Sequence, residues 1–295
     1  MHFKSILYII AISFFLILTS CEDFFETTLE LDPPPFEKTL VIDHLAYTGR
    51  DTIDFRISTN AGILENIEIY DLNINDAEVK LTVNGQSYVA KINAQASTYY
   101  NYAVILSSPL KQGDELSILA THPLYGQASS TFRFLPETDI LSAVFYEDGG
   151  LDQNGDERSK VSVKFMDKPG KNYYAVQIIA PFFNNQIRPT SVSSLDPAVF
   201  ESHERYTVLL TDDGFDGKEK ILDFQTYRIP EDWAKGNVKL VWYGISEDYY
   251  KFSRSLNAHQ NTADNPFGTP VPVTTNINGG TGIFAGHTRQ VIDVD

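Results

Sequence analysis

The feature that most constrains the fold is a strict alternation of apolar and polar residues over residues 77–83. After the pair Asn84-Gly85, Tyr88, Ala90 and Ile92 recur at every second position on the return. Alternation with a period of two is typical of a strand with one buried face. An Asn-Gly pair between two such runs indicates a tight hairpin, because both residues tolerate positive φ. A β-hairpin is therefore expected here.

Further β-type runs surround this hairpin and predict about seven strands within residues 38–135. They cover residues 38–45, 52–58, 100–106, 115–120 and 128–134. This number of short strands favours a β-sandwich of immunoglobulin or transthyretin type. The sandwich would lack an internal disulfide, because Cys21 is the only cysteine in the chain.

A second domain is predicted over residues 136–295, after the proline-containing boundary at 135–139. Its strands are expected at residues 140–146, 161–165, 173–180, 206–210, 221–224, 238–245 and near 288–294. One substantial helix is expected near 246–260, where Ser246 is a good N-cap and Glu247 and Asp248 follow in the first turn. The predicted fold class is thus all-β, with two β-sandwich-like domains and one substantial helix.

The first 21 residues are typical of a bacterial lipoprotein signal. The apolar run at 6–18 is too short to cross a hydrocarbon core of ~30 Å, so it is read as a signal peptide over 1–20. Cys21 would become the lipid-modified first residue of the mature protein, and Glu22 and Asp23 resemble the acidic export signal of surface lipoproteins. The alternatives are an uncleaved anchor helix or an ordinary secretory signal.

Residues 21–37 are predicted to form a tether, since the prolines at 33–35 favour an extended polyproline II chain and forbid a helix. An edge segment packed on the first domain is the alternative. The chain carries 39 acidic and 23 basic residues, a formal net charge of −16. Such a charge disfavours nucleic acid and anionic lipid as partners.

Several blocks of the chain resemble a known family. They are Asp76, Ala77 and Val79; Asp167, Pro169, Gly170, Asn172, Tyr173 and Tyr174; Ser246, Tyr249 and Tyr250; and the Pro-, Asn- and Gly-rich block from Asn265 to Phe284. Together with the lipobox, they resemble the Bacteroidota lipoprotein family described as domain of unknown function 4249. The resemblance implies an outer-membrane location beside a TonB-dependent transporter, and it implies no catalytic residue.

No catalytic motif is found. The six histidines lack zinc-motif spacing, and His44 and His122 are interpreted as ordinary residues of strands. There is no nucleophile elbow and no phosphate-binding or dinucleotide-binding glycine motif. The Gly279–Gly286 run is expected to form close backbone turns. The chain is therefore predicted to be no enzyme and to need no cofactor.

The candidate for cation binding is the acidic stretch 148–157. Asp152, Asn154 and Asp156 place oxygen atoms at alternate positions, which suits a hard cation such as calcium. The stretch lacks the glycine and glutamate positions of a complete EF-hand loop, so a solvated hairpin loop is the preferred interpretation. The acidic loop 212–217 is a second candidate for cation binding, and a solvated loop is again the preferred interpretation.

Exposed aromatic residues are the candidates for ligand binding. Phe182 and Phe183 are expected in the longest loop of the second domain, and Trp233 near a proline. Packing of these aromatics against the sheet, which would hold the loop in place, is the preferred interpretation. Trp242 alternates within a strand and is expected in the core.

Three functions remain open from the sequence. The leading hypothesis is a non-enzymatic, surface-facing, outer-membrane lipoprotein that binds a partner or ligand alongside a TonB-dependent transporter. A surface hydrolase acting on glycan or peptide is the second, and a structural or adhesive envelope protein is the third.

Overall fold

The predicted hairpin is confirmed. Strand β3 (Glu78–Val83) pairs with β4 (Gln86–Val89), and Val83 lies opposite Gln86 across a two-residue turn. Asn84 and Gly85 adopt φ values of 48° and 82°, which are the left-handed conformations that a type I′ turn requires.

The computed structural model describes residues 36–62, 65–93, 99–152, 154–182, 186–263, 268–269 and 271–295. The first half of the chain continues with β1 (Leu40–Tyr47), β2 (Thr52–Thr59), the 3-10 helix η1 (Ile69–Leu72), β5 (Lys91–Ile92), β6 (Tyr102–Ile105), β7 (Glu115–His122) and β8 (Gly126–Arg133). The second half contains β9 (Asp139–Tyr146), β10 (Arg158–Met166), β11 (Tyr173–Phe182), β12 (Gln186–Thr190), β13 (Val199–Glu201), β14 (Val208–Thr211), β15 (Glu219–Tyr227), α2 (Glu231–Ala234), β16 (Lys239–Ile245), α3 (Glu247–Ala263) and β17 (Gly280–Asp293).

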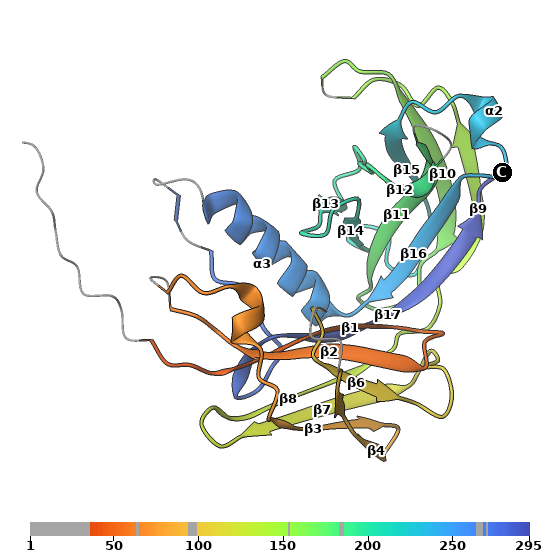
Figure 1. Ribbon diagram of the computed structural model, residues 1–295. Helices are drawn as coiled ribbons and strands as arrows, with labels where there is room; N and C mark the ends of the chain where they lie inside the picture. The colour runs from red at the N-terminus through yellow and green to blue at the C-terminus, as the bar shows by residue number, and fades with distance from the viewer. Residues whose placement is uncertain are drawn as a thin grey trace, which may run out of the picture. The chain divides into compact units, whose positions relative to one another are not determined.

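The strands form three sheets (Figure 1). The largest has the order β13-β14-β11-β16-β17-β1-β2-β6-β5, with β12 paired to β11. A sheet of order β4-β3-β7-β8 and a sheet of order β15-β10-β9 complete the fold. Strands make up 50% and helices 10% of the structure, so the predicted mostly-β, sandwich-like fold is confirmed.

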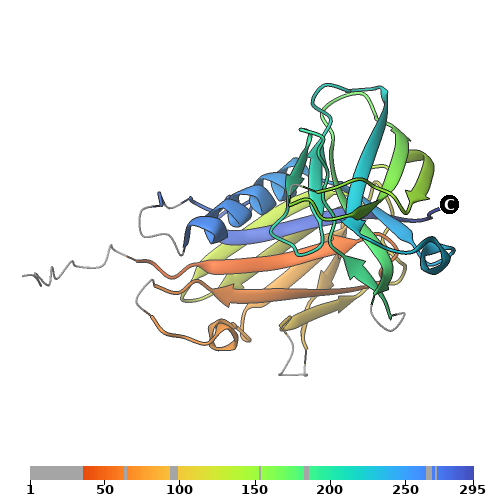
Figure 2. The same cartoon turned by 90° about the horizontal axis from the view of Figure 1, so that it is seen from above.

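The large sheet is covered by three hydrophobic clusters. The first joins β1, β2 and β6 to β3, β7 and β8, and the second joins β11, β14 and β16 to β10 and β15. The third lies on the opposite face of β11 and β16, where Tyr249 of α3 is buried. Because β16 is covered on both faces, its residues read as a continuous apolar run. The predicted helix is confirmed as α3, and Figure 2 shows it beside β17.

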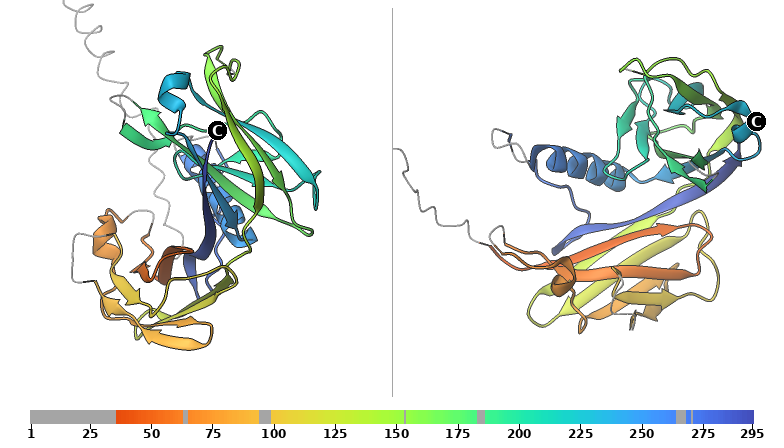
Figure 3. Two further views of the ribbon diagram at one scale, coloured as in Figure 1. Left: turned by 90° about the vertical axis from the view of Figure 1, so that its right-hand side faces the viewer. Right: turned by 45° about the horizontal axis from the view of Figure 1, so that its top comes forward.

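Strand β17 holds the large sheet together. Its first eight residues pair with β1 in parallel, from Leu40 opposite Gly280 to Tyr47 opposite His287. Its remaining residues pair antiparallel with β16, from Gly244 opposite Thr288 to Lys239 opposite Asp293. Figure 3 shows this strand running from the β1 side of the sheet to the β16 side. The sheet therefore crosses the expected boundary at 135–139, while the division into two domains stays a prediction.

The expectation of close backbone turns in the Gly279–Gly286 run is wrong from Gly280 onward. These residues begin strand β17 instead. Glycine is found at 282 and 286 because other segments of the same chain lie too close there for a side chain. A Cβ at Gly282 would collide with the carbonyl oxygen of Ile42, and one at Gly286 would collide with the ring of Phe132. Glycine is thus required here for close packing of strands.

Replacing Gly286 with alanine should lower the free energy of unfolding by about 1–3 kcal/mol, because the added methyl overpacks the Phe132 and Phe134 rings. The matched control is Gly244→Ala on β16, where the nearest atom would be 3.7 Å from the new Cβ. We expect that variant to change stability by no more than about 0.5 kcal/mol. Urea unfolding measures both, and equal effects would contradict the close approach at Gly286.

Candidate functional site

The candidate functional site is a groove formed by β9, α2 and the last residues of the chain, which lie together at one end of the fold (Figure 1). Its volume is about 800 Å³, within the range of ligand-binding sites. The apolar part of its lining comprises Val144, Phe145, Tyr146, Ala234 and Val294.

The groove exists because the chain continues past β17 to lie along β9. The amide of Asp295 donates to the carbonyl of Ala143 at 3.0 Å, and the amide of Phe145 donates to the carbonyl of Asp295 at 2.8 Å. The amide of Val294 donates to the carbonyl of Val238 at 3.3 Å, which fixes the same segment from the other side. Asp295 is thereby held against β9 beside the groove.

Five of the residues that line the groove are acidic: Glu147, Asp148, Glu231, Asp293 and Asp295. Two of these carboxylates are neutralised by ion pairs. Glu147 pairs with Arg228 at 3.0 Å, and Asp293 pairs with Lys239. The amide of Glu231 and the Arg228 guanidinium together hold the pKa of Glu147 below its usual value. Asp148, Glu231 and Asp295 line the groove together with one lysine, Lys235.

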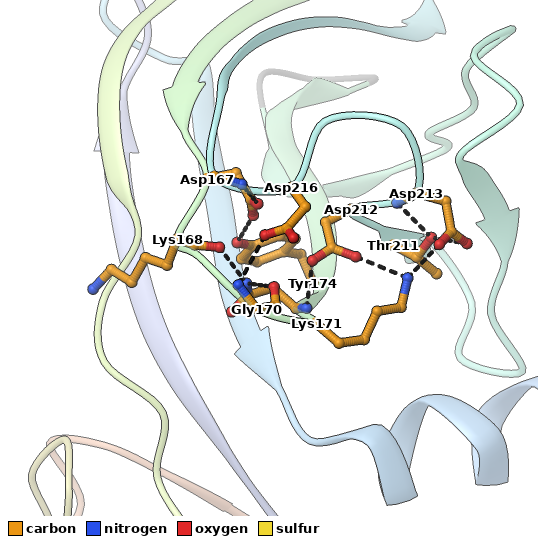
Figure 4. A network of polar contacts seen from close by, with 11 residues as sticks. Asp167, Lys168, Gly170, Lys171, Tyr174, Thr211, Asp212, Asp213 and Asp216 are labelled. Atoms are coloured by element: carbon orange, nitrogen blue, oxygen red, sulfur yellow. Dashed lines mark hydrogen bonds and ion pairs between the residues drawn. The ribbon is translucent and has the colours of Figure 1, made fainter.

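A second polar cluster joins the loop between β10 and β11 to the loop between β14 and β15 (Figure 4). Carboxylate oxygens of Asp167, Asp212 and Asp216 lie within 4.8 Å of one another, and they could hold a hard cation. Burial, followed by the charges of Asp212 and Asp216, raises the pKa of Asp167.

Protein groups already engage each carboxylate of this cluster. The Tyr174 hydroxyl and the Gly217 amide donate to Asp167, the latter at 2.9 Å. The Asn172 amide donates to Asp212 at 2.7 Å, and Lys171 pairs with its other oxygen at 2.8 Å. The Gly170 amide donates to Asp216 at 2.8 Å. These contacts tie the two loops together, so we assign the cluster a structural role.

The predicted cation ligands Asp152, Asn154 and Asp156 lie in the β9–β10 connection. Asp152 accepts the amides of Asn154 and Asp156 at 2.8 and 3.0 Å, and its second oxygen accepts from Arg158. Arg158 and these amides hold the pKa of Asp152 below its usual value. The loop is thus held by its own residues, as the hairpin interpretation expects, and calcium binding here stays a prediction.

The predicted aromatic residues do not form one site. Phe182 ends strand β11, so its placement in a loop is wrong, and its ring packs against Tyr227 and Arg188. Trp233 is 45% exposed on α2, next to residues that line the groove. Phe183, Cys21, Glu22 and Asp23 lie outside the described residues. No local sequence pattern marks the residues that line the groove, because Asp295 and β9 are brought together only by folding.

Two histidines are buried in the large sheet without a partner for one ring nitrogen. The Nε2 atoms of His44 on β1 and His287 on β17 make no hydrogen bond in the described structure. His44 Nδ1 donates to the carbonyl of Asp54 at 2.6 Å. Burial lowers the pKa of His44 to about 4, and burial followed by the charge of His203 lowers that of His287 to about 3. Both rings are therefore neutral parts of the core.

Acid should destabilise the protein through these histidines. The pKa values of both histidines lie below 6.5 in the folded state. Their contribution to the free energy of unfolding is therefore complete above pH 6.5 and is lost as the pH falls towards 4. His44→Phe should reduce the loss of unfolding free energy between pH 7.5 and 4.5 by about 2 kcal/mol relative to the parent. Denaturant unfolding at both pH values measures this, with the exposed His259→Asn as control. If the parent and His44→Phe were equally sensitive to acid, the assignment of His44 as a neutral, buried side chain would be contradicted.

Comparison with known proteins identifies the family and little else. The crystal structure of Parabacteroides merdae β-glucuronidase with glycerol in its active site is 16% identical in sequence. The match covers 71% of this chain and only 23% of the glucuronidase, with a TM-score of 0.24. At that score the likeness carries no argument. No curated protein matches the sequence. The family described as Domain of unknown function (DUF4249) matches residues 26–292, and the chain therefore belongs to that family.

Proposed function

We propose that the protein is a lipid-anchored accessory protein of the outer membrane, facing the cell exterior, which binds a partner or ligand alongside a TonB-dependent transporter. The anchoring part of the proposal is supported by the lipobox that ends at Cys21 and by the acidic residues Glu22 and Asp23. Lipid on a single cysteine can hold a folded domain at a membrane when more than one acyl chain is attached. Within the described ranges, no helix combines the length and apolar character that spanning a bilayer needs.

The binding part of the proposal rests on one observation, the groove of about 800 Å³ between β9, α2 and the end of the chain. It combines an apolar lining with charged groups, which is the usual composition of a binding site. An aromatic side chain such as Trp233, which is 45% exposed next to residues of the groove, is also typical of surfaces that meet a partner.

The hydrolase alternative finds less support among the described residues. Ser253 Oγ lies 2.8 Å from His203 Nδ1, a distance suited to a nucleophile and its base. Ser253 is a fully buried residue of α3, however, and it also contacts Ser202 at 3.0 Å. A substrate could not reach it, so this pair anchors the helix.

Changing Cys21 to alanine tests the anchor. The variant should lose incorporation of labelled palmitate and leave the membrane fraction, because the only thiol that can carry the lipid is gone. Palmitate labelling followed by membrane fractionation measures this. The control is Glu22→Ala with Asp23→Ala, which should keep the lipid and lose accessibility to protease added to whole cells. A Cys21→Ala protein that stays membrane-bound and labelled would contradict the proposal.

Purification from native membranes tests the partner. We expect the tagged full-length protein, after gentle solubilisation, to bring with it a TonB-dependent transporter in a constant ratio. The Cys21→Ala variant serves as the control, because a contact made only after solubilisation would survive the loss of the anchor. Recovery of the wild-type protein alone would count against the transporter as partner.

A further inference from the structure

The chain contains three Asn-Gly pairs, and the fold holds their asparagines to different degrees. The pairs begin at Asn84, Asn154 and Asn278. In such a pair the main-chain nitrogen of glycine can attack the side-chain amide carbon of asparagine, because glycine has no Cβ to obstruct the approach. In a folded protein the reaction depends on how firmly the asparagine side chain and the following peptide are held.

Asn84 is held by its side chain. Its Oδ1 accepts the amide of Glu115 at 2.9 Å, and its Nδ2 donates to the carboxylate of Asp114 at 2.8 Å. Both bonds must break before the side-chain amide can turn towards Gly85. The turn of the β3–β4 hairpin is thereby protected from the reaction that its Asn-Gly sequence favours.

Asn278 is held by its main chain. Its amide and its carbonyl both bond to Ser129, at 2.8 and 3.0 Å. A Cβ at Gly279 would lie 2.3 Å from the carbonyl oxygen of Gln127, so the glycine is tightly enclosed. The next residue, Gly280, already pairs with β1. Attack on the side chain requires the peptide between Asn278 and Gly279 to rotate, and these contacts oppose that rotation.

Asn154 is held much less. Both Asn154 and Gly155 are exposed, in the connection between β9 and β10. The amide of Asn154 donates to Asp152, whereas its side chain makes no hydrogen bond to any of the described residues. The amide of Gly155 donates to the carbonyl of Asp152 at 3.0 Å, and this bond has to open for the reaction. Beyond its chain neighbours, no described residue comes within 4 Å of the place of a Cβ at Gly155.

From these contacts we propose that Asn154 is a site of spontaneous deamidation, the one of the three pairs that reacts in the folded protein. The nitrogen of Gly155 loses its proton to solvent and bonds to Cγ of Asn154. The bond from Cγ to Nδ2 breaks, and Nδ2 leaves as ammonia after taking a proton from water. Water then opens the cyclic imide. Cleavage at Cγ gives aspartate, and cleavage at the main-chain carbonyl carbon gives isoaspartate. One water enters for each ammonia that leaves, and no oxidant or reductant takes part.

The product changes the connection between β9 and β10. Either form places a new negative charge between Asp152 and Asp156, and like charges repel. Isoaspartate also adds a methylene group to the main chain. Both changes weaken the bonds by which Asp152 holds the amides at 154 and 156. This inference goes beyond the proposed function, which does not depend on it.

Incubation of the full-length protein in detergent tests the proposal. The buffer is mildly alkaline, because the proton of Gly155 is lost more easily as the pH rises, and its water carries heavy oxygen. Peptide mapping by mass spectrometry measures the conversion of amide to acid at each pair, and the heavy oxygen marks conversions that occurred before digestion. Asn154 should react at least about 10-fold faster than Asn84, whose two side-chain hydrogen bonds have to break first. It should also react faster than Asn278.

The same protein in denaturant is the internal control. The fold no longer holds any of the pairs there, so Asn84, Asn154 and Asn278 should react at similar rates. The proposal would be overturned if Asn84 or Asn278 reacted as fast as Asn154 in the folded protein. It would also be overturned if Asn154 stayed intact in the folded protein while all three pairs reacted in denaturant.

Two variants separate the site from its surroundings. Asn154→Gln keeps an amide before Gly155 but would have to close a larger ring, so it should remain unconverted while Asn84 and Asn278 behave as in the parent. Asp114→Ala removes the acceptor for Nδ2 of Asn84 and should speed conversion at Asn84 alone. An unchanged rate at Asn84 would contradict its protection by the side-chain bonds. If Asp114→Ala fails to fold, the comparison of folded and unfolded parent still decides.

Discussion

The sharing of β17 between two sets of strands is the constraint on which the rest of the structure depends. One strand of 14 residues pairs in parallel with β1 and then antiparallel with β16. That arrangement brings β17 close to Ile42 and Phe132, and only glycine at 282 and 286 leaves room for them. Close packing of β17 against these neighbours thus explains glycine at both positions. The cost of these glycines in chain entropy is offset by the two ladders that the strand completes.

The candidate site follows from the same strand. Because β17 leaves β16 at Asp293, Asp295 reaches β9 and bonds to Ala143 and Phe145. A groove bounded by strand edge, short helix and carboxylates is left beside it. The acidic cluster of Asp167, Asp212 and Asp216 is different, since its oxygens are used to fasten two loops. The acidic residues that line the groove and those that fasten the two loops are therefore separate groups.

Local patterns predicted the local structure well. The alternation at 77–83, the Asn84-Gly85 turn, the helix after Ser246 and the buried Trp242 all follow from periodicity and turn chemistry, and the structure has them. Pairings between distant residues could not be predicted in this way. The parallel contact of β17 with β1 and the contact of Asp295 with β9 join segments that share no local signal. The strands β12 and β13 were missed because residues 181–204 lack a clear period.

The most direct test of the shared strand is native-state hydrogen exchange, followed by mass spectrometry across increasing denaturant. If β17 couples its two partners, amides of β1 and of β16 should lose protection together, in one transition with a single free energy. Protection that persists in β1 and β7 after it has been lost from β16 and β11 would show that the two sets of strands unfold independently. That result would contradict the central place given to β17.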